Sequence, residues 1–285
     1  MAGGEQRKTV IEAGGRNLQY WRDLWHYRGL AFHMARRDFS VRYKQTVIGL
    51  AWSLLNPLLN MLLLSLVFGT FAGFGQDSEV PYYVSVFAGV LPWTLFSRAL
   101  TVASGTLLNN AHLMTKVYFP RLVSPLASAA TALIDALISY LILFLLMGVN
   151  RYLPPARILL SFPLLLPIAL LGTCLGLVIA TMTVRFRDLN NLVPYLLQIG
   201  QYVTPVAFSM AELRERLGGG HPKLFAALYY GNPMTGLETA FKWAALRGEA
   251  LDGKALALSF LWLAAVAAFA LLRFRKVERT FVDIV

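Results

Sequence analysis

The chain has 285 residues, of which 57% are hydrophobic and only 14% are charged, and its formal net charge is +11. Soluble domains of this length are usually far less apolar, so the composition excludes an ordinary soluble enzyme and is typical of a membrane protein. The excess of Lys and Arg is read as retention signal and contact with membrane lipids, and not as a nucleic-acid surface.

Residues 1–46 are polar and basic and are expected to form a cytoplasmic segment. Within them, 18–45 mixes aromatic residues with arginines, and Tyr27, Leu30 and Met34 share one helical face. This pattern predicts an amphipathic helix that lies in the membrane interface. Two roles stay open for it, a plain juxtamembrane anchor and a docking element for a partner protein.

Six long apolar stretches follow, each sufficient for one helical crossing of a bilayer core about 30 Å thick. Such runs favour helices over a barrel, whose strands alternate in polarity and last only about ten residues. The sequence therefore predicts an all-α membrane protein with six transmembrane helices. The predicted crossings are 47–74, 83–108, 123–149, 157–183, 190–211 and 255–272, within a transmembrane domain of 47–272 that a tail of 273–285 follows.

An even number of crossings places both termini on the same side of the membrane. Both ends of the chain are basic, whereas the first loop, 75–82, contains no Lys or Arg and carries Asp77 and Glu79. Positively charged loops are retained in the cytoplasm. Both termini are therefore predicted to be cytoplasmic.

Two ionisable residues are predicted to lie inside crossings, Arg98 in the second and Asp135 in the third. A charge at the bilayer centre costs at least about 2.5–3.5 kcal/mol. At about 1.5 Å per residue their depths are about 15 and 18 Å from the cytoplasmic ends, so the two can form an intramembrane ion pair. The pair serves either to lock two helices together or to line a polar path.

Aromatic and amide side chains recur at helical spacing in the first and fifth crossings. They can join helices to one another in lipid, the tyrosines can be interfacial anchors, or both faces can border a shared cavity. Sugars offer apolar faces that lie on rings and hydroxyls that pair with amides. The predicted substrate path is lined by Trp52, Asn56, Asn60, Tyr195, Gln198, Tyr202 and Phe208.

The segment 212–254 is too long and too apolar for a plain loop, and it is interrupted at Gly231, Asn232 and Pro233. Irregular backbone at membrane depth must be buried in protein or face water, so the segment predicts a pair of short re-entrant or interfacial helices. The four histidines and the single Cys174 show no ligand spacing, so no metal site is expected.

Five stretches, in order over about residues 30–250, carry a family resemblance. They are RDFSVRYKQTVIGLAWSLLNPLL (37–59), FAGVLPWTLFS (87–97), LMTKVYFPRLVSPL (113–126), VRFRDLNNLVPYLLQIGQYVTPVAF (184–208) and NPMTGLETAFKWAALRG (232–248). Together they resemble the membrane (permease) subunit of ABC-2-type bacterial polysaccharide exporters, the group that handles O-antigen and related wall polymers.

The resemblance implies a channel-forming subunit in the bacterial inner membrane that works as a homodimer with two ABC ATPase subunits and exports a lipid-linked polysaccharide. It also implies a short coupling helix between crossings two and three, and gate helices between crossings five and six. The ATPase coupling positions that it implies here are Lys116, Val117, Tyr118, Phe119, Pro120, Arg121, Arg187 and Asp188.

No GxxxxGK[ST] phosphate loop occurs in the sequence, so ATP and Mg²⁺ are expected on the partner ATPase, and the chain is expected to be neither an enzyme nor a cofactor protein. A twofold pair also follows from geometry, since six helices are too few to enclose a polymer-wide path. Two alternatives remain: an ABC-2 exporter of drugs or small lipids, and a polytopic membrane glycosyltransferase or flippase, which needs carboxylates or a metal at the membrane face.

Overall fold

The computed structural model describes residues 17–43, 51–75, 80–109, 119–183, 186, 188–209, 212 and 222–280. Within these ranges the regular structure is helical, which confirms the predicted all-α class. Among the described residues, five helical segments are long and apolar enough to cross a membrane, which confirms a multi-pass membrane protein. They are Ala51–Phe71, Tyr82–Leu107, Val123–Val149, Ala156–Thr183 and Gly253–Val277.

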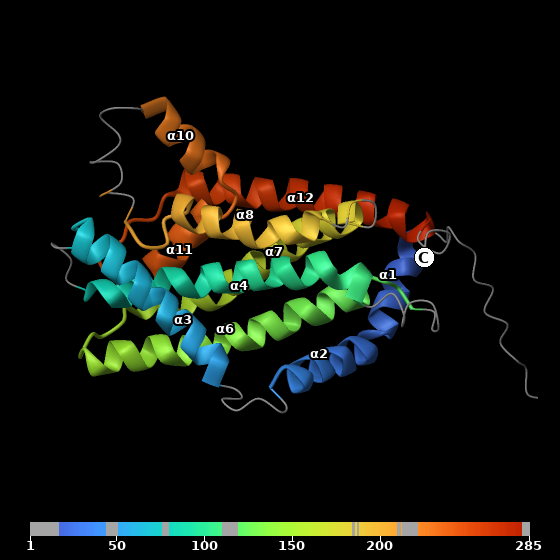
Figure 1. Ribbon diagram of the computed structural model, residues 1–285, viewed down its shortest axis with the longest axis horizontal. Coiled ribbons are helices and arrows are strands. Elements are labelled where there is room, and N and C mark those ends of the chain that lie inside the picture. The colour runs from blue at the N-terminus through green and yellow to red at the C-terminus, as the bar shows by residue number, and fades with distance from the viewer. Residues whose placement is uncertain are drawn as a thin grey trace, which may run out of the picture.

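The helices form one elongated bundle with its long axis horizontal in Figure 1. Its members are α3 (Ala51–Leu64) with the π-helical η1 (Ser65–Phe71), α4 (Tyr82–Asn109), α6 (Val123–Val149), η2 (Ala156–Leu160) with α7 (Ser161–Thr183), α8 (Leu189–Val203) and α12 (Gly253–Thr280). The helix α1 (Asn17–His26) lies at the same end of the bundle as the C-terminal end of α12. The Arg275 guanidinium carbon there lies 4.8 Å from the centre of the Tyr20 ring.

The packing centre of the bundle is the pair α4 and α7. A Cβ atom added to Gly172 would lie 2.5 Å from the carbonyl oxygen of Phe96, and one added to Gly176 would lie 2.5 Å from that of Leu100. Glycines four residues apart allow two membrane helices to approach closely, so that dispersion and weak polar contacts hold them together. The GTCLG stretch thus fixes the contact line between α7 and α4.

The fifth predicted crossing, 190–211, is shorter in the structure. Helix α8 ends at Val203, and Thr204 adopts an extended conformation with ψ of 144°. Pro205 disfavours the helical conformation for the residue before it, which explains the early end. At about 1.5 Å per residue, the 15 residues of α8 span roughly 22 Å. The last crossing is longer than predicted, because α12 continues to Thr280.

The N-terminal segment forms two helices, α1 and α2 (Arg28–Tyr43), with a turn at Tyr27 between them. The predicted apolar face of Tyr27, Leu30 and Met34 packs onto the bundle, in a cluster that includes Phe119 and Phe274. That face therefore contacts protein, and the aromatic residues left exposed are on other faces: Trp21, Trp25 and Phe32.

The described residues between α8 and α12 include two short helices, α10 (Pro222–Gly231) and α11 (Thr235–Ala245). They are separated at residues 232–234, close to the predicted interruption. Both lie at the bundle end opposite to α1 (Figure 1). Helix α11 is buried along its length, and a Cβ on Gly236 would lie 2.1 Å from the carbonyl oxygen of Ala255, so α11 rests directly on α12.

Candidate transport pathway and coupling surface

A cavity of about 630 Å³ opens between α3, α4, α6 and α8. Its lining contains Asn56 and Asn60 from α3 and Gln198 from α8, three of the residues predicted to line a substrate path. The rest of its polar lining consists mainly of hydroxyl and amide side chains: Ser53, Thr94, Ser97, Thr101, Ser139 and Gln201. The structure thus brings the amide-bearing faces of the first and fifth predicted crossings to one space.

Arg98 and Asp135 both line this cavity. The Nε atom of Arg98 lies 2.8 Å from Oδ2 of Asp135, and the two side chains are 24% and 8% exposed. The residues lie about 16 and 18 Å from the helix ends at Asn109 and Val123, so the pair sits near the middle of the bundle. The ion pair joins α4 to α6, and its arginine is the more exposed of the two partners.

The predicted ring residues lie outside the lining of the cavity. Trp52, Tyr195 and Tyr202 are 43%, 66% and 51% exposed, on α3 and α8. The Tyr202 ring also contacts Phe68 of η1, with ring centroids 6.4 Å apart. Exposed rings on two helices that border one polar cavity provide stacking surfaces beside amides and hydroxyls.

Phe208 is only 6% exposed. Its ring packs against Phe68 and Phe74, with centroid separations of 6.0 Å in both cases. In this structure the ring therefore belongs to an aromatic cluster of the protein core and offers no open surface to a ligand.

The irregular segment after α8 is held by side chains from α4, from α11 and from the connection between α10 and α11. The Tyr82 hydroxyl donates to the carbonyl of Ala207, Asn232 Nδ2 donates to Thr204 Oγ1 at 2.8 Å, and Lys242 Nζ donates to the carbonyl of Phe208 at 3.2 Å. Backbone groups freed by a helix break must find partners when no bulk water is present. The end of α8 is therefore stabilised by specific side-chain contacts.

Helix α11 carries two buried ionisable residues that the sequence reasoning missed. Glu238 is 0% exposed and Lys242 is 2% exposed. Neither carboxylate oxygen of Glu238 has a hydrogen-bond partner among the described residues. Burial raises the pKa of the Glu238 carboxyl well above its ordinary value, which the Lys242 charge opposes. The i, i+4 spacing in ETAFK was the available signal, since it places both side chains on one helical face.

The implied coupling residues are only partly described. Lys116, Val117, Tyr118 and Arg187 lie outside the described residues. Phe119 and Arg121 are 4% and 9% exposed, Pro120 is buried, and Phe119 joins the cluster that holds α2. Asp188, directly before α8, is exposed. Among these described positions, only Asp188 presents a charge at the surface.

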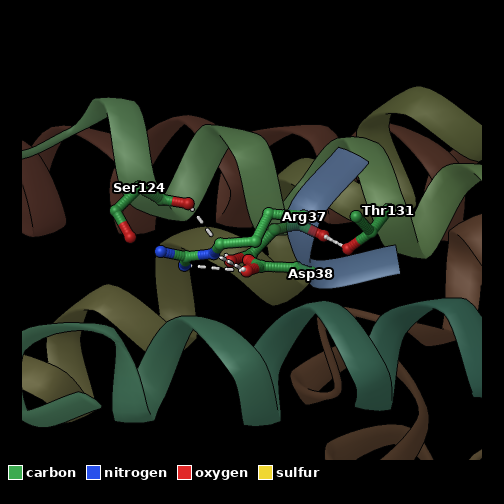
Figure 2. Close-up of polar contacts among 5 residues, drawn as sticks. Arg37, Asp38, Ser124 and Thr131 are labelled. Carbon is green, nitrogen blue, oxygen red and sulfur yellow. Dashed lines mark hydrogen bonds and ion pairs between the residues drawn. The ribbon is translucent and has the colours of Figure 1, made fainter. Parts of the chain in front are cut away.

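Helix α2 packs against α6. Arg37 Nη2 lies 2.8 Å from Asp38 Oδ1, and Figure 2 shows this ion pair close to Ser124 and Thr131 of α6. Both α6 residues are buried. Helix α2 thus packs against the helix that carries Asp135.

Residues 30–246 match the family model described as ABC-2 type transporter. The chain belongs to the ABC-2 type transporter family. As an ABC-2 membrane subunit it is a transport protein and not an enzyme. The matched range includes α3, α4, α6 and α8, the helices that enclose the cavity.

Two relatives carry a more specific description. This ABC-2 chain is 32% identical over 222 residues to the O-antigen export system permease protein RfbA of Myxococcus xanthus, which covers 78% of this chain and 82% of the relative. It is 25% identical over 185 residues to the protein of the same description from Klebsiella pneumoniae, which covers 64% of this chain and 70% of that protein.

Proposed function

We propose that this chain is the channel-forming subunit of an ATP-driven ABC transporter that exports a lipid-linked, O-antigen-like polysaccharide across the bacterial inner membrane. One observation carries the proposal. In a chain of this family, amide and hydroxyl groups from α3, α4, α6 and α8 gather on one cavity of about 630 Å³, with exposed rings on the two bordering helices α3 and α8. The descriptions of the two relatives support the same substrate class.

The working unit in this proposal is a homodimer with two ABC ATPase subunits, which bind ATP and Mg²⁺. Only 17% of an 18-residue apolar stretch of α3 and η1 is buried in the single chain. The exposed faces of α3 and α8 are the surfaces proposed to meet a second copy, so that two cavities and the rings of Trp52, Tyr195 and Tyr202 border one path. Stacking on rings is weak for each sugar, which suits a chain that must slide.

The proposed topology has six crossings, with α8 as the fifth, and both termini in the cytoplasm. Helix α8 runs along the bundle from the α1 end towards the opposite end (Figure 1). This direction supports α8 as a membrane crossing, although the helix ends at Val203. The segment that includes α10 and α11 is then the gate on the outer side. Its buried charges and its contacts with residues 204–208 are the features that hold this gate in place.

The proposed coupling surface is the α1 end of the bundle, where the ATPase pushes on α2, on residues 119–121 and on the start of α8. Asp188→Lys tests this surface more directly than a substitution of Arg121 does, because Asp188 is exposed and Arg121 is buried. Export should fall by about tenfold or more while folding and the ATPase activity of the complex persist, as expected when a charged contact is reversed. Arg247→Glu, exposed at the opposite end, is the matched control and should export normally.

Reconstitution in vesicles with the partner ATPase tests the substrate class. Polyprenyl-pyrophosphate-linked glycan should stimulate ATP hydrolysis and enter the vesicle lumen, whereas an apolar drug or a short-chain phospholipid should do neither. Stimulation by the drug or the phospholipid alone would assign the chain to the export of drugs or small lipids. Turnover of a sugar donor by the purified chain without ATPase would instead make it a glycosyltransferase.

A further inference from the structure

The cavity between α3, α4, α6 and α8 is lined by hydrogen-bond donors from two helices, Gln201 of α8 and Arg98 of α4. The Nε2 atom of Gln201 is buried without a partner among the described residues. The Arg98 guanidinium has five N–H donors. Its Nε atom lies 2.8 Å from Oδ2 of Asp135, and its side chain is 24% exposed.

The positive member of the ion pair presents more surface than the negative one. Both residues line the cavity, and Arg98 is 24% exposed whereas Asp135 is 8% exposed. Asp135 contacts Arg98 at Nε, and the guanidinium carries two further nitrogens, Nη1 and Nη2. The edge formed by these two nitrogens matches the oxygens of a phosphate or carboxylate in a bidentate geometry.

The surroundings of Arg98 favour an anion that also carries hydroxyls. Among the described residues that line the cavity, Arg98 and Asp135 are the only ionisable ones, and the other polar groups are amides and hydroxyls. Low polarity of the surrounding bundle strengthens a charge-assisted hydrogen bond relative to water. An unpaired donor at this depth, by contrast, costs free energy.

We infer that Arg98, positioned by Asp135 and assisted by Gln201, forms an anion-binding site in this cavity for a phosphate or carboxylate group of the transported molecule. The inference rests on the proposed function and names the chemical group that the path selects. Two sources carry this chemistry, the pyrophosphate of the lipid carrier and acidic groups of the glycan. Asp135 is a positioning residue, and Arg98 makes the contact.

Binding to the purified full chain in lipid nanodiscs tests the site, with two probes measured by titration calorimetry. One probe is farnesyl pyrophosphate, and the other is a lipid-free oligogalacturonate. The double variant Arg98→Gln with Asp135→Asn removes the site without leaving an unpaired ion in the bundle, so it is the variant that should keep the fold. Arg151→Gln, which removes an exposed arginine at the end of α6, is the matched control.

The expected result is that at least one probe binds the double variant about tenfold or more weakly than the unchanged chain, since a hydrogen bond to a charged group is lost. The Arg151→Gln control should bind normally, and Gln201→Leu should show a smaller loss. The probe that responds identifies the source of the anion. Equal binding of both probes to the double variant, or binding of neither probe to the unchanged chain, would overturn the inference.

The site and the export function can fail separately. If glycan stimulates ATP hydrolysis equally in the double variant and the unchanged chain, the export function is supported and the anion site is refuted. If a probe binds only when Arg98 is present but no glycan stimulates ATP hydrolysis, the anion site is supported and the export function is refuted. Equal thermal unfolding midpoints of the double variant and the unchanged chain provide the control for folding.

Discussion

Helices α3 and α4 are neighbours with opposite relations between apolarity and burial. The α3–η1 segment has a mean hydropathy of 1.8, yet only 17% of its apolar stretch is buried; α4 has a mean hydropathy of 1.4, and 72% is buried. In lipid, apolarity does not drive a helix into the protein, because the solvent is itself apolar. Close approach and polar contacts decide burial, and α4 has both, while most of the apolar stretch of α3 and η1 stays exposed in the single chain.

The largest expected effect is a loss of folded protein when the buried contact between α4 and α7 is disrupted. Gly176→Leu inserts a side chain where even a Cβ would lie 2.5 Å from the Leu100 carbonyl oxygen. Overpacking costs about 1–3 kcal/mol or more, so folded chain should be lost, as measured by the monodisperse fraction in size-exclusion chromatography. Gly148→Leu is the matched control, since nothing lies within 4 Å of a Cβ there. Equal yields of the two variants would show that α4 and α7 are not held by close approach.

A smaller effect is expected at the buried carboxyl of α11. Burial raises the pKa of Glu238 above its ordinary 4.5, and the Lys242 charge opposes this. The stabilising contribution of a raised pKa is present below the unfolded value and is lost as pH rises through the folded value. Glu238→Gln should therefore become more stable relative to the unchanged chain as pH rises above 4.5.

Thermal unfolding in detergent at about pH 5 and about pH 8 measures this difference. The advantage of Glu238→Gln at the higher pH should be about 1 kcal/mol, or roughly 2–4 °C. Burial lowers the pKa of Lys242, and the charges of Glu249, Glu238 and Glu212 oppose that shift. A lysine with a lowered pKa contributes stability that rises with pH, so Lys242 acts in the opposite direction to Glu238. Asp188→Asn, exposed at the other end, should show no such trend, and a trend of equal size there would refute the assignment to Glu238.

The smallest expected effect is a slower export when an exposed ring of α8 is removed. Tyr195→Ala removes a ring that is 66% exposed, so stability should be unchanged. Loss of a stacking surface worth about 0.5–1.5 kcal/mol should slow polysaccharide export by about two- to tenfold. Leu261→Ala, on an exposed part of α12, should leave export unchanged. A Tyr195→Ala variant that exports at the full rate would remove the ring from the proposed path.

Much of the architecture could be predicted from the sequence, because long apolar runs and their breaks are local features. The helices at 82–109, 123–149 and 156–183 lie within a few residues of their predicted ranges, and the interruption near Asn232 is present. The end of α8 was placed too late, because the uncharged run continues past Pro205 to residue 211. A proline ends a helix or merely kinks it according to partners elsewhere in the chain, here Tyr82, Asn232 and Lys242.

The candidate site could be predicted in part for the same reason. Helical spacing identified Asn56, Asn60 and Gln198 as a polar set, and depth identified Arg98 and Asp135 as possible partners; these five residues line one cavity. Spacing does not show which side of a helix meets a neighbour. Phe208, which was predicted to line the path, is buried in the structure, and so is Arg121, a coupling position that the resemblance implies. Glu238 was not among the predicted site residues.

The most direct test of a shared aqueous path is the accessibility of Tyr202. In a Cys174→Ala background, Tyr202→Cys and the matched Leu261→Cys are placed in vesicles with the partner ATPase and treated during ATP turnover with a charged, water-soluble methanethiosulfonate reagent. The account predicts that the reagent labels the Tyr202→Cys variant, blocks its export and spares the Leu261→Cys variant. Labelling of both variants only by an apolar maleimide would place Tyr202 against lipid and contradict the account.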